Sequence, residues 1–376
     1  MKLIYCICNI CNPGGMERVL LNKVRYLVER KQWDITIVTT DQKGRPPFYA
    51  FPKGVKMVDL DINYTDDNAK GALGKIWGYL KRRRLHRQRL TELLMRERAD
   101  YVVSLYPSES SFIPEIKDGS RKVLELHFCK FFRLQYGRKG LLGLIDKWRT
   151  REDERIVRRF DKFVVLTEED RGYWGNLPNM EVIPNAALVA VEQQASCEAK
   201  RVIAVGRLDY QKGFDRLIEV WRLVQQRPEA AEWKLDIFGQ GEWQEMLQQR
   251  IEEYGLQESV RINRPTSQIG REYAASSMLV MSSNYEGFPM VMIEAMAHGL
   301  PVVTFDFQCG PRDIIRPKVN GIIVKNGDIQ GLANALLQLM TDDNARKQMG
   351  MNARKVTDTY SETNVMKQWV EVFVKG

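Results

Sequence analysis

The stretch KLIYCICNICNPGGMERVLLNKVRYLVER, residues 2–30, decides the fold, because its pattern changes from strand to helix across one turn. The segment KLIYCICNI is a short apolar run of strand-forming residues, and the breaker sequence NPGG closes it. The apolar residues that recur at helical spacing after the turn are Met16, Val19, Leu20, Val24, Leu27 and Val28. The stretch therefore predicts a buried strand, a glycine turn and an amphipathic helix.

The same alternation continues along the chain. Further strands are expected at DITIVTT, ADYVVSLY, RKVLELHF and KFVVLT, with helices at RLTELLMRER and in the basic region near residues 140–159. From KRVIAVGR onward the pattern starts a second time. Strands that alternate with helices form parallel βαβ units whose sheets are covered on both faces. The sequence thus predicts an α/β protein with two doubly wound, Rossmann-like domains.

The length of 376 residues also exceeds what one hydrophobic core ordinarily supports. We place the domain boundary in a segment of weak periodicity that follows the turn-like IPN. The expected parts are an N-terminal domain at 1–185, a linker at 186–199, a C-terminal domain at 200–355 and a last helix at 356–376.

Composition narrows the class of protein. With 44% hydrophobic and 28% charged residues, the chain is typical of a globular protein rather than a disordered one. No stretch approaches about eighteen consecutive apolar residues, so we expect no membrane-spanning helix. Only a short strand-like segment follows Lys2, which argues against a secretory signal peptide. Together with the absence of a disulfide-framework spacing among the six cysteines, these features predict a cytoplasmic protein.

The net charge of +9 is unevenly distributed. Residues 1–185 hold 35 Lys and Arg against 24 Asp and Glu, a net +11, whereas residues 186–376 hold 22 against 24, a net −2. The basic excess is densest in YLKRRRLHRQRL, residues 79–90. Such a surface attracts nucleic acid, an anionic membrane or a phosphate-bearing substrate, although a charge run is equally typical of a well-solvated helix face.

Three cysteines, Cys6, Cys8 and Cys11, precede Gly14 and Gly15 in the opening stretch. No fourth cysteine and no nearby histidine completes a tetrahedral metal site, so we interpret the cysteines as small residues of the buried strand. The turn after them is a candidate phosphate site, because backbone N–H groups at the start of a helix favour an anion. NPGG lacks the spacing of the known phosphate-binding motifs, and an ordinary strand-to-helix turn is the alternative.

The densest group of candidate functional residues is SSNYEGFPMVMIEAMAHGLP, residues 282–301. Glu286 is expected at the end of a strand, and Glu294 two turns into the helix that Pro289 is suited to begin. Both carboxylates then lie at the carboxyl-end crevice of the sheet, where ligands of open α/β folds bind. There they accept hydrogen bonds from the hydroxyls of a ligand that contains two sugars. The alternative is a helix with one exposed and one capping glutamate.

Four further positions are candidates. Arg207 and Lys212 flank a turn after a predicted strand, where two cations favour a diphosphate, and surface ion pairing is the alternative. Gly239 follows another strand in FGQGE, where a glycine lets a flat ring approach the backbone. His127, one of only three histidines, is expected to end the strand VLELHF, and a purely structural role is its alternative.

Together these residues resemble the retaining family-4 glycosyltransferases of the GT-B fold, and the resemblance runs through nearly the whole chain. Its motifs are PGGMERV, LHF, VIPNA, GRLDYQKG, FGQGE, YEGFPMVMIEAMAHGLPVV and NGIIV. The resemblance implies two Rossmann-like domains that face each other across a cleft, with a nucleotide sugar held mainly by the second and an acceptor mainly by the first. It also implies that the last helix, around WVEVFV, packs on the first domain.

The resemblance further implies roles for single residues. Glu294 is expected to bind the ribose hydroxyls, and Glu286 the hydroxyls of the transferred sugar. Arg207 and Lys212 are expected to neutralise the diphosphate, and His127 to lie near the donor sugar, so that Glu286, His127, Arg207 and Lys212 form the expected catalytic group. The other positions expected to line the donor are Gly14, Gly15, Gly239, Gly287, Phe288, Pro289 and Met290.

The same resemblance implies a reaction. A hexose or N-acetylhexosamine is expected to pass with retention from a nucleotide diphosphate sugar, favoured as a UDP-sugar, without a metal or other cofactor. Cations and helix ends stabilise the charge that develops on the leaving diphosphate. The expected acceptor is a saccharide, free or linked to a polyprenyl diphosphate, in cell-surface polysaccharide synthesis. The basic first half is expected to hold the enzyme on the anionic inner face of the cell membrane.

Two other classes of protein fit parts of the pattern. An epimerase of the same fold acts on a nucleotide sugar alone and forms product without an acceptor. A nucleic-acid-binding protein would use the basic first half and bind with a steep dependence on salt. The sequence lacks the recognition module with interleaved aromatic residues that such a protein needs, so no nucleic-acid partner is expected.

Overall fold

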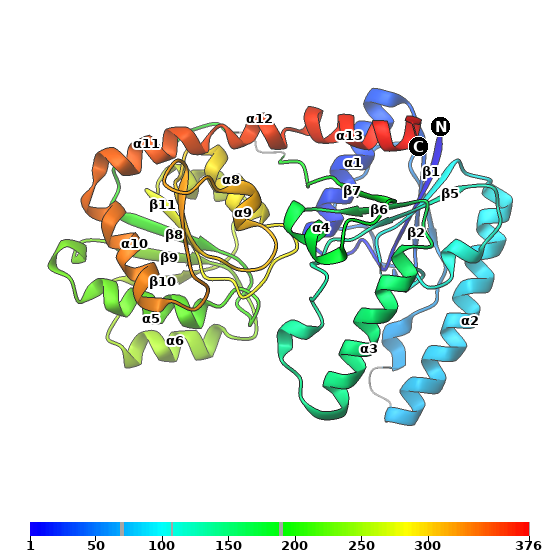
Figure 1. The fold of residues 1–376 in the computed structure, drawn as a ribbon, viewed down its shortest axis with the longest axis horizontal. Helices are drawn as coiled ribbons and strands as arrows, with labels where there is room; N and C mark the ends of the chain where they lie inside the picture. The colour runs from blue at the N-terminus through cyan, green and yellow to red at the C-terminus, as the bar shows by residue number, and fades with distance from the viewer. Residues whose placement is uncertain (68–70, 107, 188–190, 376) are drawn as a thin grey trace. The chain divides into compact units, whose positions relative to one another are not determined.

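A computed structural model describes residues 1–67, 71–106, 108–187 and 191–375 of the chain (Figure 1). The chain forms two compact units, each built on a parallel sheet. Unit 1 comprises Met1–Leu166, Arg171–Ile183 and Met366–Gly376, and unit 2 comprises Thr167–Asp170 and Pro184–Val365. The predicted fold class, α/β with two Rossmann-like doubly wound domains, is confirmed.

In unit 1 the described residues form a seven-stranded sheet in the order β3-β2-β1-β4-β5-β6-β7, with every neighbouring pair parallel. The strands are β1 Lys2–Ile7, β2 Asp34–Thr39, β3 Lys56–Asp59, β4 Tyr101–Ser104, β5 Arg121–Glu125, β6 Lys162–Val165 and β7 Met180–Val182. The main helices are α1 Gly15–Lys31, α2 Ala72–Glu97 and α3 Gly140–Val157, and α4 Glu168–Trp174 begins in unit 2 and ends in unit 1.

The opening stretch forms the strand, turn and helix that its pattern predicts. Leu3, Ile4 and Tyr5 of β1 are fully buried, and α1 begins at Gly15. β1 ends at Ile7, so Cys8 lies beyond the strand that was expected to contain it. The strand order reverses between β1 and β4, and the loops after these strands therefore emerge together at the carboxyl edge of the sheet.

The described part of unit 2 contains a six-stranded parallel sheet in the order β10-β9-β8-β11-β12-β13. Its strands are β8 Arg201–Val205, β9 Lys234–Phe238, β10 Val260–Asn263, β11 Met278–Met281, β12 Val302–Phe305 and β13 Gly321–Val324. The helices are α5 Phe214–Gln225, α6 Gln244–Glu253, α7 Ile269–Ala274, α8 Met290–Ala297, α9 Pro311–Ile314, α10 Ile329–Thr341, α11 Asp343–Ala353, α12 Val356–Tyr360 and α13 Glu362–Lys375, of which α13 continues into unit 1.

The segment expected as a linker, residues 186–199, instead packs as part of unit 2, except for residues 188–190, which lie outside the described residues. The backbone N–H of Ala195 donates to the carbonyl oxygen of His298 at 2.8 Å. Cys197 is buried, and its Sγ lies 3.3 Å from the carbonyl oxygen of Gly299. These contacts tie the second half of the expected linker to the loop that follows α8.

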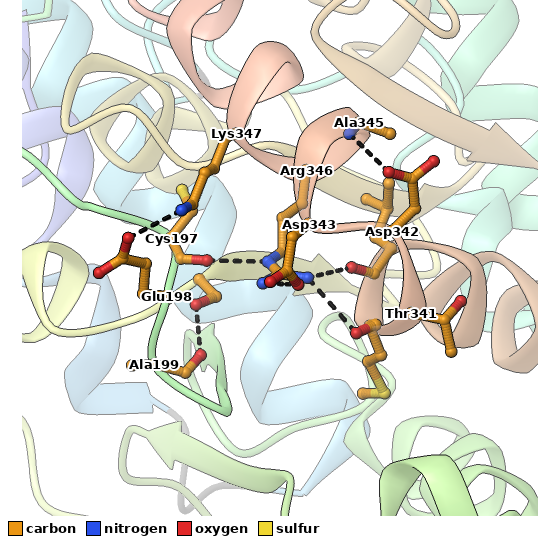
Figure 2. A network of polar contacts seen from close by, with 12 residues as sticks. Cys197, Glu198, Ala199, Thr341, Asp342, Asp343, Ala345, Arg346 and Lys347 are labelled. Atoms are coloured by element: carbon orange, nitrogen blue, oxygen red, sulfur yellow. Dashed lines mark hydrogen bonds and ion pairs between the residues drawn. The ribbon is translucent and has the colours of Figure 1, made fainter.

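Figure 2 shows the side chain that fixes this segment to the end of α10 and the start of α11. Arg346 is 2% exposed, and its Nε donates to the carbonyl oxygen of Cys197 at 2.8 Å. Its Nη1 donates to Leu339 O at 2.5 Å, and its Nη2 to Asp343 Oδ1 at 2.6 Å. The guanidinium also lies 5.2 Å from the centroid of the Trp233 ring. All three nitrogens of Arg346 are thus used.

The last turns of α13 belong to unit 1, in agreement with the expectation that the helix around WVEVFV packs on the first domain. The ring of Phe373 lies 5.8 Å from that of Trp33 and 5.1 Å from that of Tyr101. Trp369 is buried as well, and it stacks on Phe373 at 5.7 Å. Unit 1 takes up the chain again at Met366, within α13.

Candidate functional site

The strand order of unit 2 brings the predicted donor-binding residues to one edge of its sheet. The order reverses at the parallel pair β8 and β11. Arg207 and Lys212 follow β8, Gly239 follows β9 and Glu286 follows β11. Because loops after parallel strands emerge at the same edge, these residues lie at the switch point, where open α/β sheets bind their ligands.

Glu286 is the centre of this group. Its Oε1 accepts hydrogen bonds from Lys212 Nζ at 2.6 Å and from Ser283 Oγ at 2.7 Å, and its Oε2 accepts from Gln211 Nε2 at 3.1 Å. Glu286 is only 5% exposed, so these three donors hold the carboxylate in one orientation. The strand β11 ends at Met281, and Glu286 therefore lies on the following loop rather than at the strand end where it was expected.

Arg207 has a different environment from Lys212. Its side chain is 69% exposed, and its Nη2 lies 2.7 Å from Gln211 Oε1 and 3.1 Å from Asp209 Oδ2. Gln211 therefore connects Arg207 to Glu286 through two hydrogen bonds. Lys212 thus pairs directly with Glu286, whereas Arg207 is open to solvent, pairs with Asp209 and reaches Glu286 only through Gln211.

Sequence reasoning missed Gln211 and Ser283, although both lie inside the motifs that it singled out. An amide or a hydroxyl adds no charge to a motif, so the pattern does not show that these side chains support Glu286. Arg216 was missed too. Its Nη2 donates to the carbonyl oxygen of Ser283 at 2.9 Å, and its guanidinium lies 4.8 Å from the centroid of the Phe305 ring. Arg216 thereby fixes the backbone that precedes Glu286.

The two glycines of FGQGE allow close backbone packing within unit 2. A Cβ at Gly239 would lie 1.9 Å from the carbonyl oxygen of Gly206, and a Cβ at Gly241 would lie 2.3 Å from that of Leu208. The backbone N–H of Leu208 donates to the carbonyl oxygen of Gln240 at 3.0 Å. The close approach that these glycines permit is thus between the loops after β8 and β9, whereas the sequence predicted an approach by a flat ring.

Glu294 lies on the second turn of α8, and the Tyr273 hydroxyl donates to its Oε2 at 3.4 Å. Gly287, Phe288 and Pro289 form the turn between Glu286 and this helix. Pro289 is the N-cap of α8 and Met290 its first residue, one position later than predicted. Phe288 is buried, and its ring lies 5.6 Å from that of Tyr360.

In unit 1, His127 belongs to a group of ionisable side chains around the buried Glu125. Its Nε2 lies 3.2 Å from Glu125 Oε1, and Lys23 Nζ lies 2.5 Å and 2.6 Å from the two oxygens of Glu125. Lys23 Nζ also lies 3.5 Å from the centroid of the Trp369 ring. The pattern predicted His127 at the end of a strand. Because β5 ends at Glu125, His127 instead lies on the loop that follows.

These charges depend on one another. Burial acts to raise the pKa of Glu125, but Lys23 and His127 outweigh it and lower that pKa to about 2. Burial lowers the pKa of Lys23, and Glu125 opposes this effect. A signal for the pair was present in the sequence, because Lys23 lies three residues after Leu20 and four before Leu27, on the apolar face of α1.

Gly14 is the N-cap of α1 and Gly15 its first residue. A Cβ at Gly14 would lie 2.0 Å from Glu17 Oε2, whereas Gly15 has no heavy atom within 4 Å of that position. Burial raises the pKa of Glu17, and the nearby His127 acts against that rise. The carboxylate of Glu17 thus lies beside the helix N-terminus that was predicted to face a phosphate, and Gly15 is the more open of the two glycines.

The cysteines of the opening stretch are free thiols. Cys6 is buried, while Cys8 and Cys11 are half-buried. Burial, with Glu109 as a second cause, raises the pKa of Cys8 to about 11. Within the described ranges, no three His, Cys, Asp or Glu side chains are grouped to hold a metal ion. Over the same ranges, none of the helices combines the length and the apolar character needed to span a membrane.

Comparison with known families gives a match over each half of the chain. Residues 13–187 match the family model described as Glycosyltransferase Family 4. Residues 191–356 match the family model described as Glycosyl transferases group 1. The second match contains all six strands of the unit 2 sheet, and the first contains β2–β7 of the unit 1 sheet.

Individual relatives extend along the full chain. The amylovoran biosynthesis glycosyltransferase AmsD of Erwinia amylovora is 28% identical over 389 residues, which cover 99% of both proteins. The crystal structure of TarM has a TM-score of 0.81 at 18% identity, covering 99% of this chain and 98% of TarM. Anabaena Alr3699/HepE, solved in complex with UDP and glucose, has a TM-score of 0.74 at 17% identity, with both chains fully covered.

Proposed function

Because the chain belongs to the GT-B glycosyltransferases, with a Glycosyltransferase Family 4 domain followed by a group 1 domain, we propose that it transfers a hexose or N-acetylhexosamine from a UDP-sugar with retention of configuration. The main support is the Lys212–Glu286 pair at the switch point of unit 2. It combines a cation for a leaving phosphate with a carboxylate for sugar hydroxyls. The UDP and glucose bound to Alr3699/HepE, a structural neighbour, support a donor of this class.

In the proposed reaction the bond between the anomeric carbon and the diphosphate oxygen breaks. The acceptor hydroxyl oxygen forms the new bond to the same face of that carbon, and its proton passes to the leaving phosphate. Lys212 and Arg207 stabilise the negative charge that develops on the diphosphate. Glu286 accepts hydrogen bonds from the transferred sugar, and Glu294 accepts them from the ribose of the nucleotide. Glu286 is therefore a positioning group for the donor.

The proposal extends to unit 1 and to cofactors. We assign His127 to the donor sugar and the backbone of Gly15 to its phosphate. Lys212 and Arg207 supply positive charge for the leaving diphosphate, so we expect turnover to persist in EDTA. A loss of turnover in EDTA that Mg²⁺ or Mn²⁺ restores would contradict this part of the proposal.

The acceptor is proposed to be a saccharide, free or linked to a polyprenyl diphosphate, in the synthesis of a cell-surface polysaccharide. AmsD, whose name assigns it to amylovoran biosynthesis, supports this class. The net charge of +11 over residues 1–185 supports a location on an anionic membrane surface, where a lipid-linked acceptor is found.

A screen of UDP-, GDP- and ADP-sugars by thermal shift tests the donor. A ligand that binds only the folded state at about 100 times its Kd stabilises the protein by about 2.7 kcal/mol, which raises the Tm measurably. The selected donor is then tested for slow hydrolysis without an acceptor and for transfer with one. Formation of an epimerised nucleotide sugar without an acceptor, or stabilisation by no nucleotide sugar at all, would contradict the proposal.

A further inference from the structure

The helix α3 of unit 1 buries mostly polar side chains and exposes its large apolar ones. The side chains that it buries are Asp146, Thr150, Asp153 and Val157, three of which are polar. The large apolar side chains of its first three turns are exposed, with exposed fractions between 40% and 74%: Leu141, Leu142, Leu144, Ile145 and Trp148. An ordinary surface helix, such as α5 with its buried leucine, valine and tryptophan, shows the reverse arrangement.

The buried polar side of α3 is satisfied by its contacts. Asp146 accepts two hydrogen bonds from the guanidinium of Arg138, at 2.8 Å and 2.9 Å. Asp153 accepts from the Tyr106 hydroxyl at 3.1 Å and also pairs with Arg133. These contacts fix the rotation of the helix about its own axis. The apolar side chains are therefore turned to solvent by specific contacts on the opposite side.

Four of the five exposed residues lie on one face of the helix, and Leu142 lies at the margin of that face. Leu141, Ile145 and Trp148 follow the i, i+4, i+7 spacing of a single helix face, and Leu144 lies beside them. Five leucine, isoleucine and tryptophan side chains on three turns make a contiguous apolar patch, which marks a contact surface. We call these five residues the α3 stripe.

Basic side chains border the α3 stripe. Lys147, Arg149 and Arg151 are all exposed, and Lys139 precedes the helix. Of the acidic side chains of α3, Asp146, Asp153 and Glu154 are paired with Arg138, Arg133 and Lys130, and Glu152, one turn after Trp148, is half-exposed, so basic side chains remain in excess beside the stripe. A second copy of the same face would bring like charges together, which disfavours a dimer through this patch. An anionic lipid surface complements both the charge and the apolar stripe.

A second helix of unit 1 has the same character at its start. Trp77 of α2 is 73% exposed, and Lys75 and Lys81 lie on the same helix. Figure 1 shows α2 and α3 both beginning at the lower edge of this unit. Tryptophan with basic neighbours is typical of helices that lie at the boundary between headgroups and acyl chains.

We propose that the α3 stripe inserts into the headgroup region of an anionic bilayer and docks unit 1 on the membrane, with Lys147, Arg149 and Arg151 contacting lipid phosphates. This rests on the proposed function in one respect, because a lipid-linked acceptor gives the docking its purpose. The proposed partner is a lipid surface that is anionic and that apolar side chains can enter. A soluble polyanion therefore does not bind in its place.

Flotation of the full chain with vesicles tests the proposal. The wild type is expected to float with vesicles of phosphatidylglycerol and phosphatidylcholine, and to stay at the bottom with phosphatidylcholine alone. The variant Leu144→Ser/Trp148→Ser keeps every charge and is expected to lose about tenfold or more in partitioning. The variant Lys147→Gln/Arg149→Gln keeps the α3 stripe. It is expected to lose about as much partitioning, because it removes two positive charges near the lipid surface. Val319→Ser/Met351→Ser, at exposed positions of unit 2, is the matched control and should float as the wild type does.

Three results would overturn the proposal. The first is unchanged flotation of Leu144→Ser/Trp148→Ser, and the second is equal flotation with neutral vesicles. The third is a wild-type dimer by light scattering that the same variant dissociates, which would assign the stripe to a second copy. Donor hydrolysis by every variant is measured in parallel. If the wild type does not hydrolyse the donor, that result contradicts the proposed function. The flotation result is then still a valid test of membrane binding.

Discussion

Lys212 Nζ lies 2.6 Å from Glu286 Oε1, so the cation expected at the diphosphate is held by the carboxylate expected at the sugar. Both side chains are largely buried, and each is the charge partner of the other. A donor therefore meets a preorganised pair whose orientation requires little change during the reaction.

Glu286→Gln is expected to lower kcat by about 100-fold or more, because it removes a charged acceptor for the transferred sugar. Thermal stabilisation by UDP should stay close to that of the wild type, since glutamine keeps an acceptor oxygen for Lys212 and the nucleotide does not contact residue 286 directly in the proposed complex. Steady-state kinetics and thermal shift separate the two effects. Lys347→Gln, which breaks an exposed ion pair with Glu198, is the control. Full turnover by Glu286→Gln would remove it from the mechanism.

Glu294→Ala is expected to weaken UDP binding by about tenfold to a hundredfold, because it removes charge-assisted hydrogen bonds to the ribose. Isothermal titration measures this directly. Tyr273→Phe is the matched variant, since it removes only the hydroxyl that lies 3.4 Å from Glu294 Oε2. We expect Tyr273→Phe to lose much less affinity. Equal losses in the two variants would indicate that Glu294 acts through the packing of α8 and not on the nucleotide.

The buried pair of Lys23 and Glu125 makes unit 1 sensitive to single substitutions. Lys23→Met is expected to lower its free energy of unfolding by about 3–5 kcal/mol, because Glu125 then remains buried without its main charge partner. Lys23→Met/Glu125→Leu should recover most of this loss, since an apolar pair replaces the ion pair. Urea unfolding of the single and double variants measures the coupling. Additive losses would show that the two residues stabilise the unit independently.

The buried Arg346 leads to a similar prediction for the stability of unit 2. Arg346→Lys is expected to lower the free energy of unfolding by about 2–4 kcal/mol, because a single ammonium cannot replace guanidinium bonds to Cys197, Leu339 and Asp343. Lys347→Ala, one position further on the exposed side of α11, should change it by less than about 0.5 kcal/mol. A near-neutral Arg346→Lys would mean that water replaces these hydrogen bonds.

The sequence predicted the elements whose pattern is strong and local. β1, β8 and β11 are apolar runs next to glycine turns, and they lie at the centres of their sheets. β3 and β7 were not predicted, because both are short edge strands and the exposed residues of β3 give no apolar run. An edge strand is defined by its neighbour in the sheet, which a local pattern does not contain.

The candidate functional residues were likewise predicted only where the sequence pattern is local. The pattern located Glu286, Lys212 and Arg207, because charged residues in a glycine-containing turn are conspicuous. It did not show that Gln211 links them, since that contact joins the loops after β8 and β11. The inverted helix α3 was likewise predicted as a helix without its orientation. Its buried face depends on partners outside the helix, such as Arg133 for Asp153.

Glu109 gives unit 1 a dependence on pH. It is buried, and its Oε1 accepts a hydrogen bond from Ser104 Oγ at 2.6 Å. Burial raises the pKa of Glu109 from 4.5 to about 7, although the Ser104 hydrogen bond opposes the rise. A carboxyl group whose pKa is higher in the folded state stabilises the fold in its neutral form. This contribution is complete below the unfolded pKa and is lost as the pH rises through the folded pKa.

The matched variant is Glu109→Gln, which stays neutral at every pH and keeps an oxygen for Ser104. Between pH 4.5 and pH 8 the unfolding free energy of the wild type should fall by about 3 kcal/mol relative to this variant. His86 acts in the opposite direction, because burial lowers its pKa to about 4 and its neutral form stabilises the fold at higher pH. Both proteins contain His86, so the difference between their urea unfolding curves isolates Glu109. Parallel pH profiles would show that the pKa of Glu109 is the same in the folded and the unfolded protein.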